Sequence, residues 1–368
     1  MFGNRTVKEA KLLVKAAGKV IANRKDLLSE TQIADIETSR TQLKETIAGG
    51  DTTQIKEKAN QLESICQGVL PRYKHPVIRE YCEVLLVAFI LAAGIRAYFL
   101  QPFKIPTGSM QPTLNGIIGY PTDDTGPALP VKLFQKFAIG RSYLDIVAQQ
   151  PQTVTNVELM TQNFFFTRSR ITTTAGSYTA PVPPETLVNH FHVRPGKTYL
   201  PGQAIARGYA DTGDQVFVDK FSYHFVRPSL GDVFVFRTNN IRGIEEQYAN
   251  SQFYIKRIGG TAGDKLRIDP PLLYIDGAIP DVFGLKRVMS LKDGYKGYSN
   301  QSAAGSRFMF LGTPEATFTV PPKSYFSLGD NSYNSADSRD WGIVPQQNVV
   351  GRGFIVYWPF TSHWGLIR

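Results

Sequence analysis

The sequence predicts a chain of three parts: an N-terminal α-helical segment, one transmembrane helix and a larger, mainly β domain. Three observations predict this order. Apolar residues recur at helical spacing near the N-terminus, an uncharged apolar run covers Val84–Ile95, and short alternating runs typical of strands fill the chain from Gln101 onward. We therefore place the parts at residues 1–76, 77–100 and 101–368.

Composition and charge narrow the class of protein. The chain has 368 residues, of which 42% are apolar and 20% charged, so it can bury the cores of two or three folded units and is not wholly disordered. Its two cysteines, Cys66 and Cys82, cannot form a disulfide framework, and no C-x-x-C pair predicts a zinc site. The net charge of +10 fits either nucleic acid or an anionic membrane surface.

Three apolar stripes predict three helices in the N-terminal segment. They run from Val7 to Ile21, from Ile33 to Ile47 after a capping signal at Ser29, and from Ile55 to Ile65. The stripes favour a small helical bundle or hairpin, with a partner-binding coiled coil as the alternative. The basic excess of this segment fits a solvated face near anionic lipid better than a nucleic-acid site.

The apolar run that follows predicts the membrane span. It has twelve uncharged residues, and nineteen if Cys82–Leu100 is counted with its two charges, whereas roughly 17–25 are needed to cross a bilayer. A buried helix of a soluble domain is the alternative. A span is favoured, with the N-terminal segment in the cytoplasm and the larger domain outside, by the basic residues before the run and the aromatic residues after it: Arg72, Lys74 and Arg79, then Tyr98 and Phe99.

Five short runs predict the strands of the larger domain. They are rich in β-branched and aromatic residues and are bounded by Gly, Pro or Asp. They lie at residues 215–220, 232–237, 253–258, 272–276 and 354–358.

The first candidate site residue is Ser109, in the run PTGSMQPTL. Gly108 leaves room for another backbone, and the flanking prolines restrict the loop, so the hydroxyl can be held in one direction. Gly-Ser pairs are usually only turns, and a serine nucleophile needs a base. Histidine is the usual base, but His75 precedes the apolar run, and none of the others has a companion acidic motif: His190, His192, His224 and His363.

The second candidate is Lys256, in the strand run YIKRIGG. Side chains alternate along a strand, so Lys256 and Arg257 point to opposite faces, and one can stay in water while the other is directed inward. Burial disfavours the ammonium form and lowers the pKa of a lysine from about 10.4 toward neutral, which makes a base. The alternative leaves both charges in water at a sheet edge.

The third candidate region is the run GDNSYNSADSRDWG, from Gly329 to Gly342. Its Asn, Asp and Ser content predicts a loop whose side chains bond its own backbone. A functional loop would use Ser335 as a hydroxyl partner that orients the lysine amine. Asp337 and Arg339 would form an ion pair that braces the loop.

Together and in this order, the motifs resemble bacterial type I signal peptidases, serine-lysine membrane proteases that remove signal peptides from exported preproteins. The resemblance covers roughly residues 84–119, 213–276 and 324–368, about 40% of the chain. It implies Ser109 as the nucleophile and Lys256 as the general base. It also implies oxyanion donors and supporting residues, namely the Thr107 hydroxyl with the Ser109 amide, and Ser335, Asp337 and Arg339.

The resemblance further implies a fold, a location and partners. The domain would be a β-rich fold with an apolar face on the membrane, outside the bacterial cytoplasmic membrane, held by a single-pass anchor. The implied partners are preproteins with an A-x-A-like cleavage site, membrane lipid and, as a further candidate, the secretion translocon. Nucleic acid, metal and cofactors are not implied.

Two regions depart from the family pattern. Typical members pass almost directly from the serine motif to the strand at residues 215–220, whereas this chain inserts residues 120–212, which we expect to form strands and loops on the exported domain. Residues 277–323 are a second, variable region, and the N-terminal helices replace a very short N-terminus or an extra span.

Two other functions compete with peptide hydrolysis. A catalytically silent relative would bind exported chains on the same scaffold, but it would be free to lose Ser109 or Lys256, and both are present. A soluble self-cleaving repressor uses similar serine-lysine chemistry on a related β domain. It should carry a DNA-binding helix-turn-helix, and the N-terminal stripes contain no convincing one.

Overall fold

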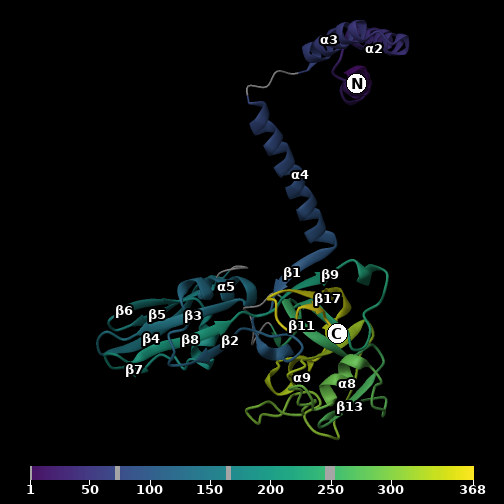
Figure 1. Cartoon of the computed structure of the whole chain (residues 1–368). Coiled ribbons are helices and arrows are strands. Elements are labelled where there is room, and N and C mark those ends of the chain that lie inside the picture. The colour runs from purple at the N-terminus through teal and green to yellow at the C-terminus, as the bar shows by residue number, and fades with distance from the viewer. Residues whose placement is uncertain (1, 71–74, 163–166, 245–252) are drawn as a thin grey trace. The chain divides into compact units, whose positions relative to one another are not determined.

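The computed structural model describes residues 2–70, 75–162, 167–244 and 253–368. It divides into two compact units, Met1–Phe89 and Ile90–Arg368 (Figure 1). The basic residues Arg72 and Lys74, on which the membrane orientation partly rested, lie outside the described residues.

The first unit contains the three helices that the apolar stripes predict. They are α1 (Phe2–Arg24), α2 (Glu30–Gly49) and α3 (Thr52–Val69). The predicted capping signal is present, because Ser29 Oγ accepts a bond from the Gln32 N–H while the Ser29 N–H donates to the Gln32 side chain at 3.0 Å. Gly50 ends α2 in the left-handed region (φ 78°), and the Asp51 carboxylate then caps α3.

The three helices bury one stripe each against the others, as a small bundle does. The side chain of Arg24 also joins α1 to the end of α3, because it donates to the Val69 carbonyl at 3.1 Å. The buried core consists of Ala10, Val14, Ala17, Ile36, Leu43, Ile55, Leu62 and Cys66.

The predicted transmembrane helix is wrong. Residues 77–98 do belong to one helix, α4 (Pro76–Tyr98), yet none of the helices in the described ranges has both the length and the apolar character that crossing a membrane requires. The physical reason is charge: Glu83 and Arg96 bound an uncharged stretch of twelve residues. At about 1.5 Å per residue, that stretch covers roughly 18 Å of a hydrocarbon core about 30 Å thick.

The predicted mainly β fold class is also wrong, because the described chain is mixed α/β. Besides α1–α4, the described residues of the second unit contain four helices: α5 (Leu129–Ile139), α6 (Pro184–Asn189), α8 (Phe283–Met289) and α9 (Ser338–Trp341). The clearest case is α5, in a region expected to hold only strands and loops. Pro130 in its first turn and Gly140 in the left-handed region after its last (φ 70°) are ordinary helix boundaries.

An antiparallel sheet of eight strands forms the centre of the second unit. All five predicted runs are strands, and four of them belong to this sheet. The order is β1 (Leu100–Lys104), β9 (Gln215–Asp219), β17 (Val349–Trp358), β10 (Val233–Arg237), β11 (Phe253–Gly260), β15 (Ser324–Leu328) and β16 (Val344–Pro345), with β18 (Gly365–Leu366) on β17.

Both faces of this sheet are buried at β10. On β10, Val233 and Val235 enter one apolar cluster while Phe234 and Phe236 enter another, as the alternation of side chains along a strand requires. In the register between β10 and β11, Phe234 pairs with Lys256 and Val233 with Arg257. Both cross-strand partners are buried, and so are Lys256 and Arg257 themselves.

Three smaller sheets surround the central one. The fifth predicted run is β13 (Leu272–Ile275), which pairs with β12 (Lys265–Asp269), itself flanked by β14 (Thr317–Thr319). Residues 118–211 form the other two sheets, grouped in Figure 1. These are β2 (Ile118–Pro121), β8 (Ala204–Asp211) and β3 (Arg141–Val147), and then β6 (Gly176–Ala180), β5 (Thr167–Thr173), β4 (Gln152–Gln162) and β7 (Thr198–Tyr199).

Candidate active site

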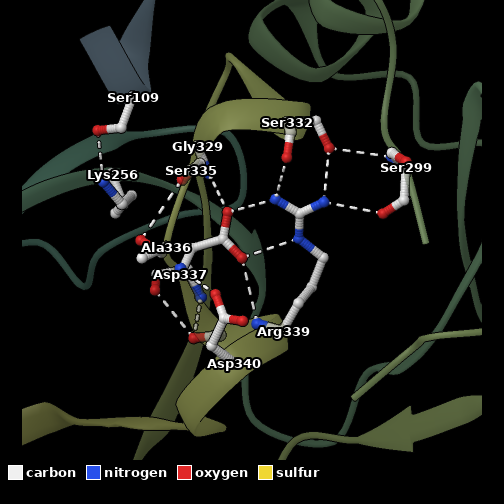
Figure 2. Close-up of polar contacts among 12 residues, drawn as sticks. Ser109, Lys256, Ser299, Gly329, Ser332, Ser335, Ala336, Asp337, Arg339 and Asp340 are labelled. Carbon is white, nitrogen blue, oxygen red and sulfur yellow. Dashed lines mark hydrogen bonds and ion pairs between the residues drawn. The ribbon is translucent and has the colours of Figure 1, made fainter. Parts of the chain in front are cut away.

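The fold brings Ser109 and Lys256 into direct contact, although 147 positions separate them in the chain. Ser109 lies in a short 3-10 helix, η1 (Gly108–Met110), and Lys256 lies on β11. The Lys256 Nζ is 2.6 Å from the Ser109 Oγ, a hydrogen bond in which the ammonium donates and the neutral amine accepts (Figure 2).

The backbone around Ser109 is fixed from both sides. Met110 is fully buried in an apolar cluster with Leu114, which anchors η1 to the sheet. Asn331 holds the other side, because its N–H donates to the Ser109 carbonyl at 3.1 Å and its side-chain amide donates to the Gly108 carbonyl at 3.0 Å. The direction of the Ser109 hydroxyl therefore follows from packing rather than from a mobile loop.

The Lys256 amine is almost completely removed from solvent, with 4% of the residue exposed. Burial lowers the pKa of Lys256 to about 8, although Asp337 and Asp330 act in the opposite direction. The Tyr254 ring lies 5.5 Å from the Nζ. An amine with this pKa is partly neutral near physiological pH and can accept a proton from a bonded hydroxyl.

The expectation that Lys256 or its neighbour Arg257 would stay in water is wrong, because both are buried. Arg257 is compensated by Asp330: its Nε and Nη2 donate to the two carboxylate oxygens at 2.8 and 2.6 Å. Its Nη1 donates to the Gly231 carbonyl at 2.8 Å. Burial alone would lower the pKa of Arg257, but the Asp330 carboxylate holds it above its ordinary value.

Asp330 was not singled out from the sequence, although it lies inside the GDN run. Besides Arg257, it accepts a short hydrogen bond from the Thr113 hydroxyl, and Tyr295 bonds that hydroxyl at 2.8 Å. This network joins the segment after Ser109 to the strand that carries Lys256. Its partners are far apart in the sequence, so spacing alone gave no signal for it.

The structure joins Asp337 and Arg339 as the sequence motif implied. The Arg339 Nη2 and Nε lie 2.7 and 2.8 Å from the Asp337 carboxylate, and both side chains are fully buried. The rest of the guanidinium binds other loops, because it donates to the Ser299 carbonyl and to the hydroxyl and carbonyl of Ser332. Asp337 also accepts a bond from the Gly329 N–H at 2.9 Å, so the pair closes the loop on itself (Figure 2).

Ser335 is buried in the same loop, but its hydroxyl bonds a different group from the one the resemblance implied. Within the described residues, its Oγ donates to the Ala336 carbonyl, at a long 3.5 Å, and not to the Lys256 amine. Gly329 lies so close that a side chain there would meet the Ser335 Oγ at 2.0 Å. The glycine therefore makes room for Ser335 beside the site.

Thr107 precedes η1 and makes no capping bond with its side chain. It lines a cavity of about 490 Å³ that also exposes the Ser109–Lys256 pair. The remaining walls come from four segments: Gly108 and Gln111, Asn189 and His190, Tyr254, and Asn331, Asn334 and Ala336. Asn189 and His190 belong to the inserted region and were not expected here.

One histidine has an acidic partner in the structure, although no companion acidic motif marks it in the sequence. His363 Nδ1 lies 2.9 Å from the Asp214 carboxylate, which also accepts the Asn115 N–H at 2.7 Å. The pair is separated by 149 positions, so no local motif marks it. Within the described ranges, no cluster of His, Cys, Asp and Glu side chains could hold a metal ion.

Comparison with known proteins defines the class to which this site belongs. A model of the family described as "Signal peptidase, peptidase S26" matches residues 201–358. The chain is 30% identical to a probable signal peptidase I-1 of Synechocystis sp. over 42% of its own length and 67% of that protein. It is 31% identical to a signal peptidase I of Leptolyngbya laminosa over 44% of its own length and 68% of that protein.

The class is therefore that of serine endopeptidases, which are hydrolases. Within it, the chain belongs to the signal peptidase I family. A crystal structure of a signal peptidase I from Enterococcus faecalis is 26% identical and covers 34% of this chain and 97% of that one, with a TM-score of 0.25.

Replacement of Asp337 by Asn should destabilise the second unit strongly. The change leaves the fully buried Arg339 charge without its carboxylate, and breaking a buried pair in this way costs about 3–5 kcal/mol. Urea unfolding followed by tryptophan fluorescence measures this, since all three tryptophans lie in the second unit. Glu158→Gln is the control, because its ion pair with Arg170 is half exposed and should contribute at most about 1 kcal/mol. Equal midpoints for the two variants would contradict the bracing role of the pair.

Proposed function

We propose that Ser109 and Lys256 form a catalytic dyad that hydrolyses the peptide bond between a signal peptide and the exported protein. The observation that carries this proposal is the 2.6 Å contact between a half-buried serine hydroxyl and a buried lysine amine whose pKa lies near 8. A serine hydroxyl is a weak nucleophile until a base accepts its proton, and here the amine is the group in contact.

In the first half of the reaction, the neutral Lys256 amine takes the proton of the Ser109 hydroxyl as its oxygen attacks the scissile carbonyl carbon. The negative charge that develops on the carbonyl oxygen would be stabilised by the Ser109 N–H and the Thr107 hydroxyl. One such donor is typically worth about 3–4 kcal/mol. The position of Thr107 on the cavity wall next to Ser109 supports this role.

In the second half, the Lys256 ammonium returns its proton to the leaving nitrogen, and the C–N bond breaks to leave an ester on Ser109. A water molecule that gives a proton to the neutral amine attacks this ester. The Lys256 ammonium then gives this proton to the Ser109 oxygen as the ester C–O bond breaks, which leaves a free carboxylate on the signal peptide and the regenerated serine. Asp337, Arg339 and Ser335 act by holding the loop beside the amine.

The proposed substrates are preproteins with small residues in an A-x-A-like cleavage site, bound in an extended conformation. Membrane lipid and the secretion translocon are proposed as further partners, and nucleic acid is not. Family membership supports the substrate class, and the open cavity at the dyad supports binding of a peptide segment.

We also propose that the second unit works on the outer side of the bacterial cytoplasmic membrane, where preproteins emerge. Protease added to intact spheroplasts should then digest this unit, as detected with an epitope placed in it. Protection of the epitope until the membrane is lysed would contradict this location.

Ser109→Ala and Lys256→Ala should each abolish processing, with losses of at least about 10³-fold in kcat, because the nucleophile and its base act as a unit. The assay is cleavage of a reporter preprotein by the purified chain. His192→Asn is the control and should cleave the reporter like the wild type, because His192 is exposed and lies outside the cavity. Normal cleavage by either dyad variant would reject the mechanism.

The dependence of rate on pH should follow the protonation of Lys256. The protonated amine cannot accept the serine proton, so kcat/KM should rise about tenfold per pH unit below about 8 and level off above it. Lys256→Arg should be inactive at every pH, since a guanidinium stays charged. A flat wild-type profile between pH 5 and 10 would show that no lysine base is involved.

A further inference from the structure

We infer that the insertion completes the substrate-binding wall: Asn189 and His190 bind the preprotein segment beside the scissile bond and select a polar, uncharged residue at a position outside the two small residues of the A-x-A-like site. This inference rests on the proposed function and assigns a role to the insertion. Its starting point is the cavity of about 490 Å³, in which these two residues share walls with Ser109 and Lys256.

The insertion is bonded to the central sheet at the end of β17. The Trp358 indole N–H donates to the Phe137 carbonyl at 2.7 Å, and the Phe360 N–H donates to the Ala138 carbonyl at 3.0 Å. Both acceptors lie in the last turn of α5. Gly140 follows directly, and a side chain there would collide with Thr212 and Trp358. These contacts fix the position of α5, and with it this part of the insertion, against the end of β17.

Inside the insertion, the end of α6 is held against β2. The His190 Nδ1 lies 3.2 Å from the Gly119 nitrogen and 3.1 Å from the Gly119 oxygen, so one tautomer or the other makes a backbone bond. Gly119 has no space for a Cβ, which would come within 2.8 Å of His190 and Phe191. Thr186 and Leu187 are buried on the inner side of α6. Asn189, the last residue of α6, and His190, which follows it, line the cavity.

The chemistry of this wall fits a peptide with polar groups. An Asn side chain both donates and accepts hydrogen bonds, and the imidazole nitrogen that is not engaged by Gly119 either donates or accepts, according to the tautomer. Apart from Lys256, the side chains that line the cavity carry no formal charge when histidine is neutral. A polar, uncharged substrate side chain such as Ser or Asn can satisfy these groups, whereas Leu would leave them without partners.

The test uses the full chain and a panel of reporter preproteins that keep the A-x-A-like site and carry Ser, Asn or Leu at one other residue flanking the cleavage site. Asn189→Ala and His190→Asn are the variants; the second keeps a polar group near the Nδ1 position and so retains a partner for Gly119. Each should raise KM about 2- to 10-fold for the Ser and Asn reporters, with kcat within twofold of wild type. The preference over the Leu reporter should disappear at one flanking position, while His192→Asn should retain it.

Binding measurements separate this inference from the proposed chemistry. In a Ser109→Ala background, adding His190→Asn should raise the Kd of the Ser and Asn reporter peptides by the same factor as it raises KM. The Kd of the Leu peptide should not change. Unchanged Kd values and unchanged preferences would overturn the inference even if the dyad is correct. Cleavage by Ser109→Ala would overturn the dyad while the binding result still decides the role of α6. An equal loss for all reporters, with a lower thermal midpoint, would show only a structural role and would overturn the inference.

Discussion

The site depends on the burial of one cation, the Lys256 ammonium, away from water. Lys256, Arg257 and Arg339 are all buried, but they are compensated differently. Each arginine lies against its own carboxylate, Asp330 or Asp337, whereas no carboxylate in the described residues lies within ion-pair distance of the Lys256 amine. The arginines therefore keep their charge, while the lysine is the cation whose charged form the fold disfavours.

The two arginine pairs also hold the frame around that amine. Asp330–Arg257 ties β11 to the segment after Ser109, and Asp337–Arg339 closes the loop that follows β15. Asn331 lies between the two carboxylates in the chain and holds the backbone of η1. The same fourteen-residue run from Gly329 to Gly342 therefore positions the serine, the strand of the lysine and the charges around it.

Local signals in the sequence predicted local structure well. The Ser29 cap, the helices of the first unit and the five strand runs needed only neighbours in the chain, and the motif order gave the family. The sequence failed to predict side-chain contacts between residues that are far apart in the chain. The sequence could not pair Asp214 with His363, or Asp330 with Arg257. The pairing of strands that are distant in the chain brings these side chains together, and the sequence does not show that pairing. The Ser335 hydroxyl bonds the Ala336 carbonyl and lies close to Gly329. A sequence motif shows neither contact.

The transmembrane prediction failed for a different reason, since apolar residues were counted across the two charges that bound the run. The insertion has one more consequence. Its first and last strands, β2 and β8, are paired neighbours, with Ile118 opposite Asp211. The polypeptide thus leaves the rest of the second unit and rejoins it at almost one point. A lobe connected in this way can be gained, lost or exchanged in a single genetic event without rethreading the strands on either side.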